Sequence, residues 1–241
     1  MVVNVSSASN ADRIAPEADA DPRSQRRAAR RSENRTEILD AAERVFGQHG
    51  VRDGSLRQIA VLSGFSPAAI YLFFENKQDL LVETLTRRGA VLVNALQDAA
   101  EGDLSPIDTL HRIIDITKAF FEAHPDFRGL VRHLTGGAAV VGPALAGYAN
   151  HVDGYFNKAM TLLTDIVARG QEMGEIREGN ALALAHLYSV LVNEHVLLGS
   201  EDGSKVVPLS EGQFHALVDG ALRKSGLGTE AKGAPWVPVD D

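Results

Sequence analysis

The feature that most constrains the fold of this chain is a stretch of twenty residues, 55–74, in which two helix-start signals flank one glycine. Ser55 is of a residue type that caps helix N-termini, and Ser66 followed by Pro67 is a second start of the same kind. Gly64 stands between them, where we expect the chain to reverse so tightly that a side chain would clash. The spacing therefore predicts two short helices joined by a tight turn.

Longer helices are predicted on both sides of this stretch. Apolar residues at three- and four-residue spacing form one stripe over about 34–49, and Gly50 ends that helix. The second short helix covers about 67–74, and Asn76 then caps a long amphipathic helix. Two short helices with a glycine-containing turn are the unit that places its second helix in the major groove of DNA. Residues 33–80 are therefore predicted to form a three-helix helix-turn-helix DNA-binding domain.

Helical periodicity continues through the rest of the chain, without the alternation typical of strands. Further helices are predicted over about 106–123, 125–136, 143–169, 181–198 and 211–224. Gly170 is expected to end the third of these, and Asn180 and Ser210 to cap the last two. We therefore predict an all-α fold of about nine helices, with a larger helical domain at 81–225 and a flexible tail at 226–241.

The first 32 residues are expected to be disordered, because they contain no aromatic and few bulky aliphatic side chains. The C-terminal end of this 32-residue tail is a basic arm, which contains Arg23, Arg26, Arg27, Arg30 and Arg31. The arm is either a solvated charge run or a segment that lies along phosphates or enters a minor groove. The chain has a net charge of −8, yet residues 22–80 hold ten basic and seven acidic residues. Its positive charge is thus gathered where the helix-turn-helix is predicted.

Composition excludes several other classes of protein. The sequence contains no cysteine, which rules out disulfides, zinc–thiolate sites and cysteine nucleophiles. It shows no secretory signal, and we expect a cytoplasmic protein. The apolar run 181–198 nears the length of a membrane span, but it holds His186, Asn193, Glu194 and His195, which are costly in lipid. We therefore expect a buried or interface helix there and no membrane partner.

Catalytic patterns are not visible either. No histidine pair has the HExxH spacing of a zinc helix, and no GxSxG turn presents a nucleophile. His111 and Asp115 lie four residues apart on one predicted helix, without a third ligand. We therefore expect no enzyme, no metal and no cofactor, and an all-helical enzyme with an incidental helix-turn-helix is the weakest hypothesis.

The run TEILDAAERVFGQHGVRDGSLRQIAVLSGFSPAAIYLFFENKQDLL resembles the DNA-binding region of TetR-type regulators. The resemblance covers about residues 34–81, a fifth of the chain. It rests on fixed spacings of Ile38, Ala41, Ala42, Phe46, Gly50, Ser55, Ile59, Ala60, Gly64, Ser66, Tyr71, Phe74, Lys77, Leu80 and Leu81. It implies a homodimeric repressor that releases its operator when a small molecule binds the C-terminal helices. An activator or co-regulator without a small-molecule inducer is the alternative.

The resemblance also implies roles for individual residues at the DNA. It assigns phosphate contacts to Ser55, Ser66, Tyr71 and Lys77, and places Arg57, Pro67, Ala68, Ala69 and Leu72 near base edges. Two dipeptides depart from the family pattern, Pro67-Ala68 and Leu72-Phe73, which leaves few hydrogen-bond donors on the reading face. Thymine methyl contacts and DNA shape are then expected to carry more of the specificity. Leu72 and Phe73 have a second interpretation, in which one or both pack under the long fourth helix.

Ligand binding is likewise implied by the resemblance, between the C-terminal helices. Such pockets are apolar with a few convergent polar groups. The candidates are Phe120, Phe121, Phe127, His133, Tyr148, Tyr155, Phe156, Tyr188 and Asn193, each of which could instead simply pack in the core. Phe120 and Phe121 are adjacent, so we expect at most one of them to line a cavity.

The helices at about 181–198 and 211–224 are predicted to form a dimer interface. The first is nearly apolar all round, and its small residues Ala181, Ala183, Ala185 and Ser189 permit close helix approach. With Phe214, Leu217, Val218 and Leu222 of the last helix, two copies would form a four-helix bundle. A twofold dimer places two recognition helices about 34–36 Å apart and reads a palindromic operator in double-stranded DNA.

Overall fold

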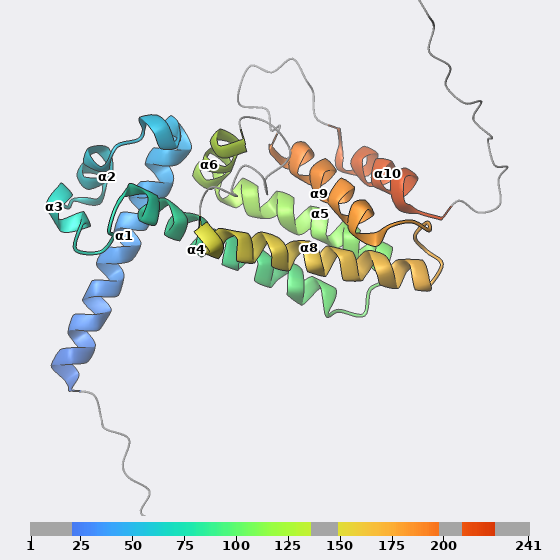
Figure 1. Cartoon of the computed structure of the whole chain (residues 1–241), viewed down its shortest axis with the longest axis horizontal. Helices are drawn as coiled ribbons and strands as arrows, with labels where there is room; N and C mark the ends of the chain where they lie inside the picture. The colour runs from blue at the N-terminus through green and yellow to red at the C-terminus, as the bar shows by residue number, and fades with distance from the viewer. Residues whose placement is uncertain (1–20, 136–148, 198–208, 225–241) are drawn as a thin grey trace, which may run out of the picture. The chain divides into compact units, whose positions relative to one another are not determined.

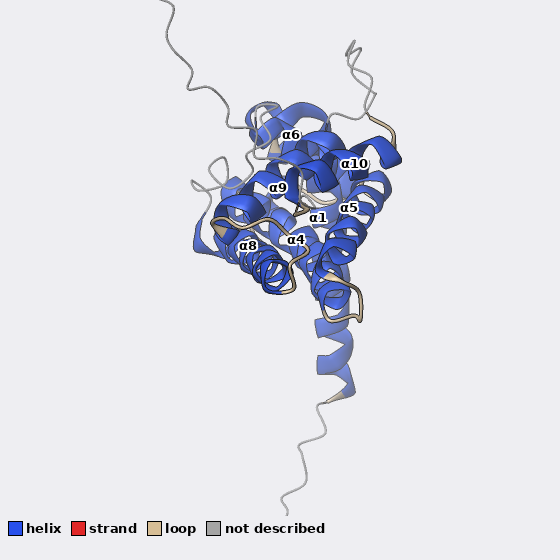
Figure 2. Cartoon of the chain, turned by 90° about the vertical axis from the view of Figure 1, so that its right-hand side faces the viewer, coloured by secondary structure: helices blue, strands red, loops and turns tan. Residues whose placement is uncertain are grey.

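The computed structural model of the chain describes residues 21–135, 149–197 and 209–224, and every regular element within these ranges is a helix (Figure 1, Figure 2). The helices are α1 (Pro22–Asp53), α2 (Leu56–Ser63), α3 (Pro67–Ile70), α4 (Lys77–Ala100), α5 (Pro106–Ala123), α6 (Pro125–Thr135), α8 (Ala149–Glu172), α9 (Ala181–Leu197) and α10 (Glu211–Leu222). The predicted all-α fold of about nine helices is confirmed. The chain divides into two compact units, Met1–Glu37 and Ile38–Asp241.

Helix α1 begins at Pro22, well before the predicted start near Asn34. Asp21 caps it: the backbone N–H of Arg23 donates to the Asp21 carboxylate at 3.2 Å, and that of Ser24 to the Asp21 carbonyl at 2.8 Å. The prediction of disorder was wrong for 22–32, because a lack of apolar side chains prevents core burial but not helix formation. Alanine, arginine and glutamine are strong helix formers. Residues 1–20 and the predicted tail 226–241 lie outside the described residues.

From Ile38 onward, α1 packs its apolar stripe against α2, α3 and α4 in one core. Its fully buried members are Ile38, Ala42 and Phe46 from α1, Ile59 and Ala60 from α2, Ile70 from α3, Phe74, and Leu80 and Leu81 from α4. Gly50 interrupts α1 with a φ of 74°, a left-handed conformation that glycine adopts without the cost of a side chain. The regular part of α1 therefore ends at Gly50, as predicted, and a kink there separates it from the last residues of the helix, 51–53.

The remaining helices form a bundle around α5 and α8. Helix α8 packs against α4, α5 and α9; α5 also contacts α6, and α10 lies on α9 (Figure 1). Asn180 and Ser210 cap α9 and α10 as expected from sequence, and Ser105 caps α5. None of the helices in the described ranges has both the length and the apolar character that a membrane span requires.

Helix α8 continues past its predicted end at Gly170, as far as Glu172. A Cβ at Gly170 would collide with the Ile176 side chain and lie 3.1 Å from Pro106 Cβ, so this glycine permits close packing rather than ending a helix. The left-handed residue that follows the helix is Gly174, with a φ of 73°. Residues 143–148 of the predicted helix lie outside the described residues.

Candidate DNA-binding surface and apolar cavity

The turn between α2 and α3 is fixed by local hydrogen bonds. Ser55 and Gln58 form a capping box, in which the Gln58 N–H donates to Ser55 Oγ at 3.2 Å and the Ser55 N–H donates to Gln58 Oε1 at 2.7 Å. Ser66 Oγ accepts the Ala69 N–H at 3.1 Å at the start of α3. Gly64 has a φ of 73°, yet a Cβ there would meet nothing within 4 Å. The turn therefore needs glycine for its backbone conformation and not, as predicted, for space.

Helix α3 is shorter than the predicted range 67–74. It ends at Ile70, and the chain continues in tight turns through which Leu72 N–H donates to Ala69 O and Phe73 N–H to Ile70 O. These i→i+3 bonds are typical of a tightened last helical turn. Three aromatic residues at 71, 73 and 74 lose side-chain freedom in a regular helix, which favours this ending.

The structure places the two residues of the departing dipeptide Leu72-Phe73 differently. Leu72 is 73% exposed and Tyr71 is 56% exposed, so neither packs under α4. Phe73 is half-buried and stands edge-on to the ring of Phe65, with centroids 6.4 Å apart. Phe73 therefore packs partly against the core beside Phe65, whereas Leu72 stays exposed. A further exposed apolar residue, Val61 of α2 (78%), was missed, although its place opposite the buried Ile59 and Ala60 is a signal in the sequence.

The other predicted DNA contacts are accessible to different degrees. Exposed residues are Arg57, Ser66, Pro67 and Ala68, and half-buried residues are Ser55, Ala69 and Lys77. Lys77 Nζ donates to the Arg52 carbonyl at 3.4 Å and lies 5.9 Å from the centroid of the Phe46 ring. Its ammonium group is thus held at the start of α4, where Asn76 Oδ1 accepts the Asp79 N–H. These positions share the α2–α3 region and the N-terminus of α4; their roles at DNA stay predictions.

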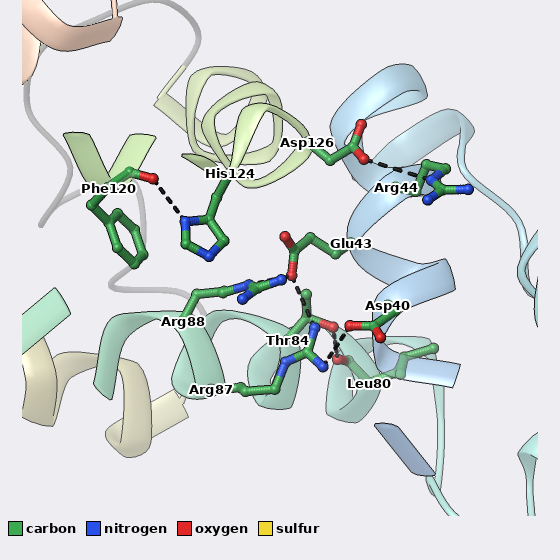
Figure 3. Close-up of polar contacts among 10 residues, drawn as sticks. All are labelled: Asp40, Glu43, Arg44, Leu80, Thr84, Arg87, Arg88, Phe120, His124 and Asp126. Atoms are coloured by element: carbon green, nitrogen blue, oxygen red, sulfur yellow. Dashed lines mark hydrogen bonds and ion pairs between the residues drawn. The ribbon is translucent and has the colours of Figure 1, made fainter. Parts of the chain in front are cut away.

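A buried ion pair joins α1 to α4 (Figure 3). Glu43 is only 5% exposed and accepts from Arg87 Nη2 at 2.9 Å and from Arg88 Nε at 2.7 Å. Arg87 also pairs with Asp40 at 2.8 Å. This cluster was not predicted from the sequence, because its acidic and basic members are more than 40 residues apart in the chain. Both arginines lie on α4 next to Leu85 and Gly89, which line the cavity described below.

Helices α1 and α6 approach each other at two glycines. A Cβ on Gly47 would collide with the backbone of Asp126, and a Cβ on Gly129 would collide with the backbone of Gly47. Arg44 Nε pairs with the Asp126 carboxylate at 3.6 Å across the same contact (Figure 3). The helix-turn-helix is therefore tied both to α4 and to α6.

An apolar cavity of about 160 Å³ lies between α4, α5, α6, α8 and α9. Six predicted pocket residues line it, namely Phe121, Phe127, Tyr155, Phe156, Tyr188 and Asn193. Phe120 is buried and packs edge-on against Phe121 and Phe127. Of the adjacent pair, only Phe121 therefore lines the cavity, as expected. His133 is exposed and lies beside Gly50, away from the cavity. Tyr148 lies outside the described residues.

The polar groups of the cavity wall are few. Thr117 Oγ1 donates to the Ile113 carbonyl at 2.7 Å, and the buried Tyr188 hydroxyl donates to the Leu110 carbonyl at 2.6 Å. Burial raises the pKa of Tyr188 well above its ordinary value, so this phenol stays neutral. Asn193 Nδ2 donates to Ser189 Oγ at 3.4 Å, and Tyr155 is a further polar residue of the wall. No acidic, basic or histidine side chain is among the described residues of the wall.

The predicted dimer helices bury more of their apolar surface within the chain than expected. Phe214, Val218 and Leu222 of α10 are each at most 2% exposed and pack in the chain's own core, as does Ala185 of α9. They are therefore not available to a second copy, contrary to prediction. The large apolar side chains that remain exposed are Leu182 (57%) and Leu187 (47%) on α9 and Leu217 (46%) on α10.

The structure also shows which partners the histidine noted in the sequence, His111, and its neighbour His215 have. His111 pairs with Asp219 at 3.0 Å rather than with Asp115, which pairs with His215 at 3.3 Å. The two imidazole rings stack with centroids 4.6 Å apart, so they fasten α10 to α5. In the described ranges, no group of three or more candidate ligand side chains is placed to hold a metal ion.

A capped helix-turn-helix joined to a helical bundle with an apolar cavity defines a class of protein, the helix-turn-helix transcriptional regulators. Comparison with known proteins supplies the family. Residues 38–84 match the sequence profile described as "Bacterial regulatory proteins, tetR family". This match to a TetR-family profile confirms, for the helix-turn-helix, the resemblance found in the sequence.

Similarity to individual proteins extends beyond the helix-turn-helix. The fatty acid metabolism regulator protein of Bacillus subtilis is 25% identical over 198 residues, covering 78% of this chain and 95% of that protein. The crystal structure of the regulator FadR from Bacillus subtilis with stearoyl-CoA gives a TM-score of 0.60 at 17% identity, over 77% and 94% of the two chains. That of AibR with isovaleryl coenzyme A and operator DNA gives 0.62 at 18% identity, over 79% and 98%. The two structures confirm the fold, and the two Bacillus subtilis proteins are named as regulators.

Proposed function

We propose that this chain is a homodimeric repressor that binds a palindromic operator and releases it when a small apolar effector enters the cavity. The observation that carries the proposal is the double role of α4. One part of this helix lines the cavity with Leu85, Gly89 and Leu92, while Arg87 and Arg88 hold Glu43 of α1. A ligand that displaces α4 therefore acts directly on the helix-turn-helix.

The effector class follows from the size and chemistry of the cavity. An engineered protein cavity of about 150 Å³ binds benzene, so about 160 Å³ corresponds to a group of similar bulk. A wall without ionisable acids or bases favours an uncharged group, with Ser189 and Asn193 as its hydrogen-bonding partners. Two structural neighbours are complexes with acyl-coenzyme A molecules. We infer a short acyl chain as the buried part of the effector, with any charged part outside the cavity.

The exposed faces of α9 and α10 support the homodimer. These faces contain large apolar side chains that are exposed to solvent in the single chain, namely Leu182, Leu187 and Leu217. Burying such a face between two copies is favourable by about 25 cal/mol per Å² of apolar area. A symmetric dimer would then pair two α3 helices with the two halves of a palindrome.

Footprinting of the region upstream of the chain's own and neighbouring genes tests DNA binding. We expect a protected palindrome whose occupancy falls steeply as salt rises. The operator-bound mass, measured by analytical ultracentrifugation, should correspond to two chains for each palindrome. Absence of any protected palindrome contradicts the repressor proposal.

Thermal shifts test the effector, because a ligand that binds the native state raises the melting temperature. The panel contains isovaleryl-CoA, stearoyl-CoA, free isovalerate and coenzyme A alone. We expect the largest shift with the short acyl thioester, together with release of the footprinted DNA. In a different outcome, the protein binds DNA but no compound shifts its melting temperature or releases the DNA. That outcome would favour the alternative function, an activator or co-regulator without an inducer.

A further inference from the structure

The N-terminal part of α1 presents a dense basic surface. Residues 22–32 contain five arginines and no acidic residue, a net charge of +5 in a chain whose total is −8. The arginines are Arg23, Arg26, Arg27, Arg30 and Arg31, and all are exposed. Because they are three and four residues apart on an α-helix, they share one side of it. We call residues 22–32 the basic helix.

The helix-turn-helix itself carries little positive charge for DNA. Residues 33–80 hold five basic and seven acidic residues, a net charge of −2. Arg44 is paired with Asp126, and Lys77 donates to a backbone carbonyl. Arg87 and Arg88 of α4, just beyond this range, are paired with Glu43. Affinity for a duplex rises with the number of phosphates that arginine and lysine neutralise, so this surface alone supplies a small electrostatic share.

We propose that the basic helix is a second DNA-binding element, which contacts phosphates of the duplex independently of base sequence. The inference rests on the proposed DNA-binding function. It adds that the basic helix supplies most of the electrostatic affinity of the protein for DNA. Eleven helical residues extend about 16 Å, a length over which duplex DNA presents about ten phosphate charges. Arginine suits this partner because its guanidinium donates to phosphate oxygens in a bidentate fork.

The test compares the salt dependence of DNA binding in three full-length proteins. One is the wild type, and one carries R23Q, R26Q, R27Q and R30Q, which removes four charges. The matched control carries R23K, R26K, R27K and R30K, which keeps them. Glutamine and lysine have helix propensities close to that of arginine, and far-UV circular dichroism checks that the helix is retained. Arg31 stays in place because it already has an interaction within the chain.

Fluorescence anisotropy measures affinity for a short duplex of random sequence between about 50 and 200 mM salt. If all four arginines contact phosphates, the slope of log affinity against log salt should become shallower by about 3 to 4 per chain in the glutamine variant. The lysine variant should keep the wild-type slope. Affinity for a footprinted palindrome should fall by the same factor as affinity for the random duplex.

Two results would overturn the inference. Equal slopes for the wild type and the glutamine variant, with DNA binding intact, would leave the helix-turn-helix proposal standing and remove the basic helix from it. Arginine-dependent binding to vesicles of anionic phosphatidylglycerol, with an unchanged DNA slope, would assign the surface to a membrane instead. A wild type that binds no duplex even at low salt would refute both proposals together, and that result needs no variant.

Discussion

Gly47 of α1 and Gly129 of α6 face each other so closely that a Cβ on Gly129 would overlap the Gly47 backbone, while a Cβ on Gly47 would overlap that of neighbouring Asp126. Two helices in backbone contact have no flexible side chain between them to absorb a displacement. Helix α6 also contributes Phe127 and Val131 to the cavity wall. We therefore expect a ligand that displaces α6 to displace α1 as well.

Replacing Gly47 by alanine should separate α1 from α6. The new methyl group meets backbone atoms, which cannot move aside as a side chain can. Overpacking of this kind costs about 1–3 kcal/mol, and we expect the free energy of unfolding in urea to fall by that amount. Gly154→Ala in α8 is the matched control, since a Cβ there meets nothing within 4 Å. The control should stabilise the helix by about 0.5–1 kcal/mol, and equal losses in both variants would contradict the packing argument.

Glu43→Gln should destabilise the chain more than a surface substitution does. The change leaves Arg87 and Arg88 facing a neutral amide, and breaking a buried ion pair in this way costs about 3–5 kcal/mol. The side chains of Arg87 and Arg88 remain about a quarter exposed, at 26% and 25%, so we expect the lower end of this range.

A double-mutant cycle with Arg88→Gln isolates the pair itself. Because Arg88 Nε and Glu43 are 2.7 Å apart, the two losses should not add, and the double variant should be more stable than their sum predicts. Additive losses would show that Glu43 is held mainly by Arg87. Urea unfolding at neutral pH provides all four free energies.

Local features of this fold were accessible from the sequence. A cap depends on a side chain and a backbone N–H three residues away, so Ser55, Ser66, Asn76 and Ser210 could be assigned from their neighbours alone. The start of α1 was misjudged because composition was taken as a sign of disorder, whereas helix propensity depends on residue type and not on burial. Phe121 could not be chosen over Phe120, since both are compatible with a buried helix face.

Long-range features were not accessible in the same way. The pairing of Glu43 with Arg87 joins residues 44 positions apart, and charged residues at these places are equally compatible with solvent. Gly47 appears in the sequence only as a weak helix former inside a helix. Its function in packing becomes visible when Gly129, on another helix, is found against it. Likewise, Phe214 and Leu217 share the apolar pattern of α10, but only the structure separates the core residue from the exposed one.

Acidification should weaken the contact between α9 and α10 through His195. Burial lowers the pKa of His195, and the nearby charges of Lys118 and His215 lower it further, against an opposing effect of Glu211. Because the pKa of His195 is lower in the folded chain than in the unfolded chain, folding favours the neutral ring. The stability that His195 contributes is therefore present above the ordinary pKa near 6.5, and it is lost as pH falls through the folded-state pKa. His195→Phe keeps an aromatic ring to stack on Phe214, 3.9 Å away between centroids, but cannot be protonated. Melting temperatures should therefore fall less steeply below about pH 6.5 in the variant than in the wild type. Parallel curves would contradict this role.

Tyr71 and Leu72 should have different effects on DNA binding, although they are adjacent and both exposed. The Tyr71 hydroxyl is proposed to donate to a phosphate, which every sequence presents, so Tyr71→Phe should weaken binding to all duplexes alike. The loss of one hydrogen bond is about 1 kcal/mol, or roughly fivefold in affinity. Leu72 is proposed to contact a thymine methyl group, so Leu72→Ala should relax the preference at one base position and leave other positions unchanged. Binding to a library of single-base variants of the footprinted palindrome distinguishes the two outcomes. A position-specific effect of Tyr71→Phe, or a uniform effect of Leu72→Ala, would reverse the two assignments, because a phosphate contact carries no base information and a methyl contact does.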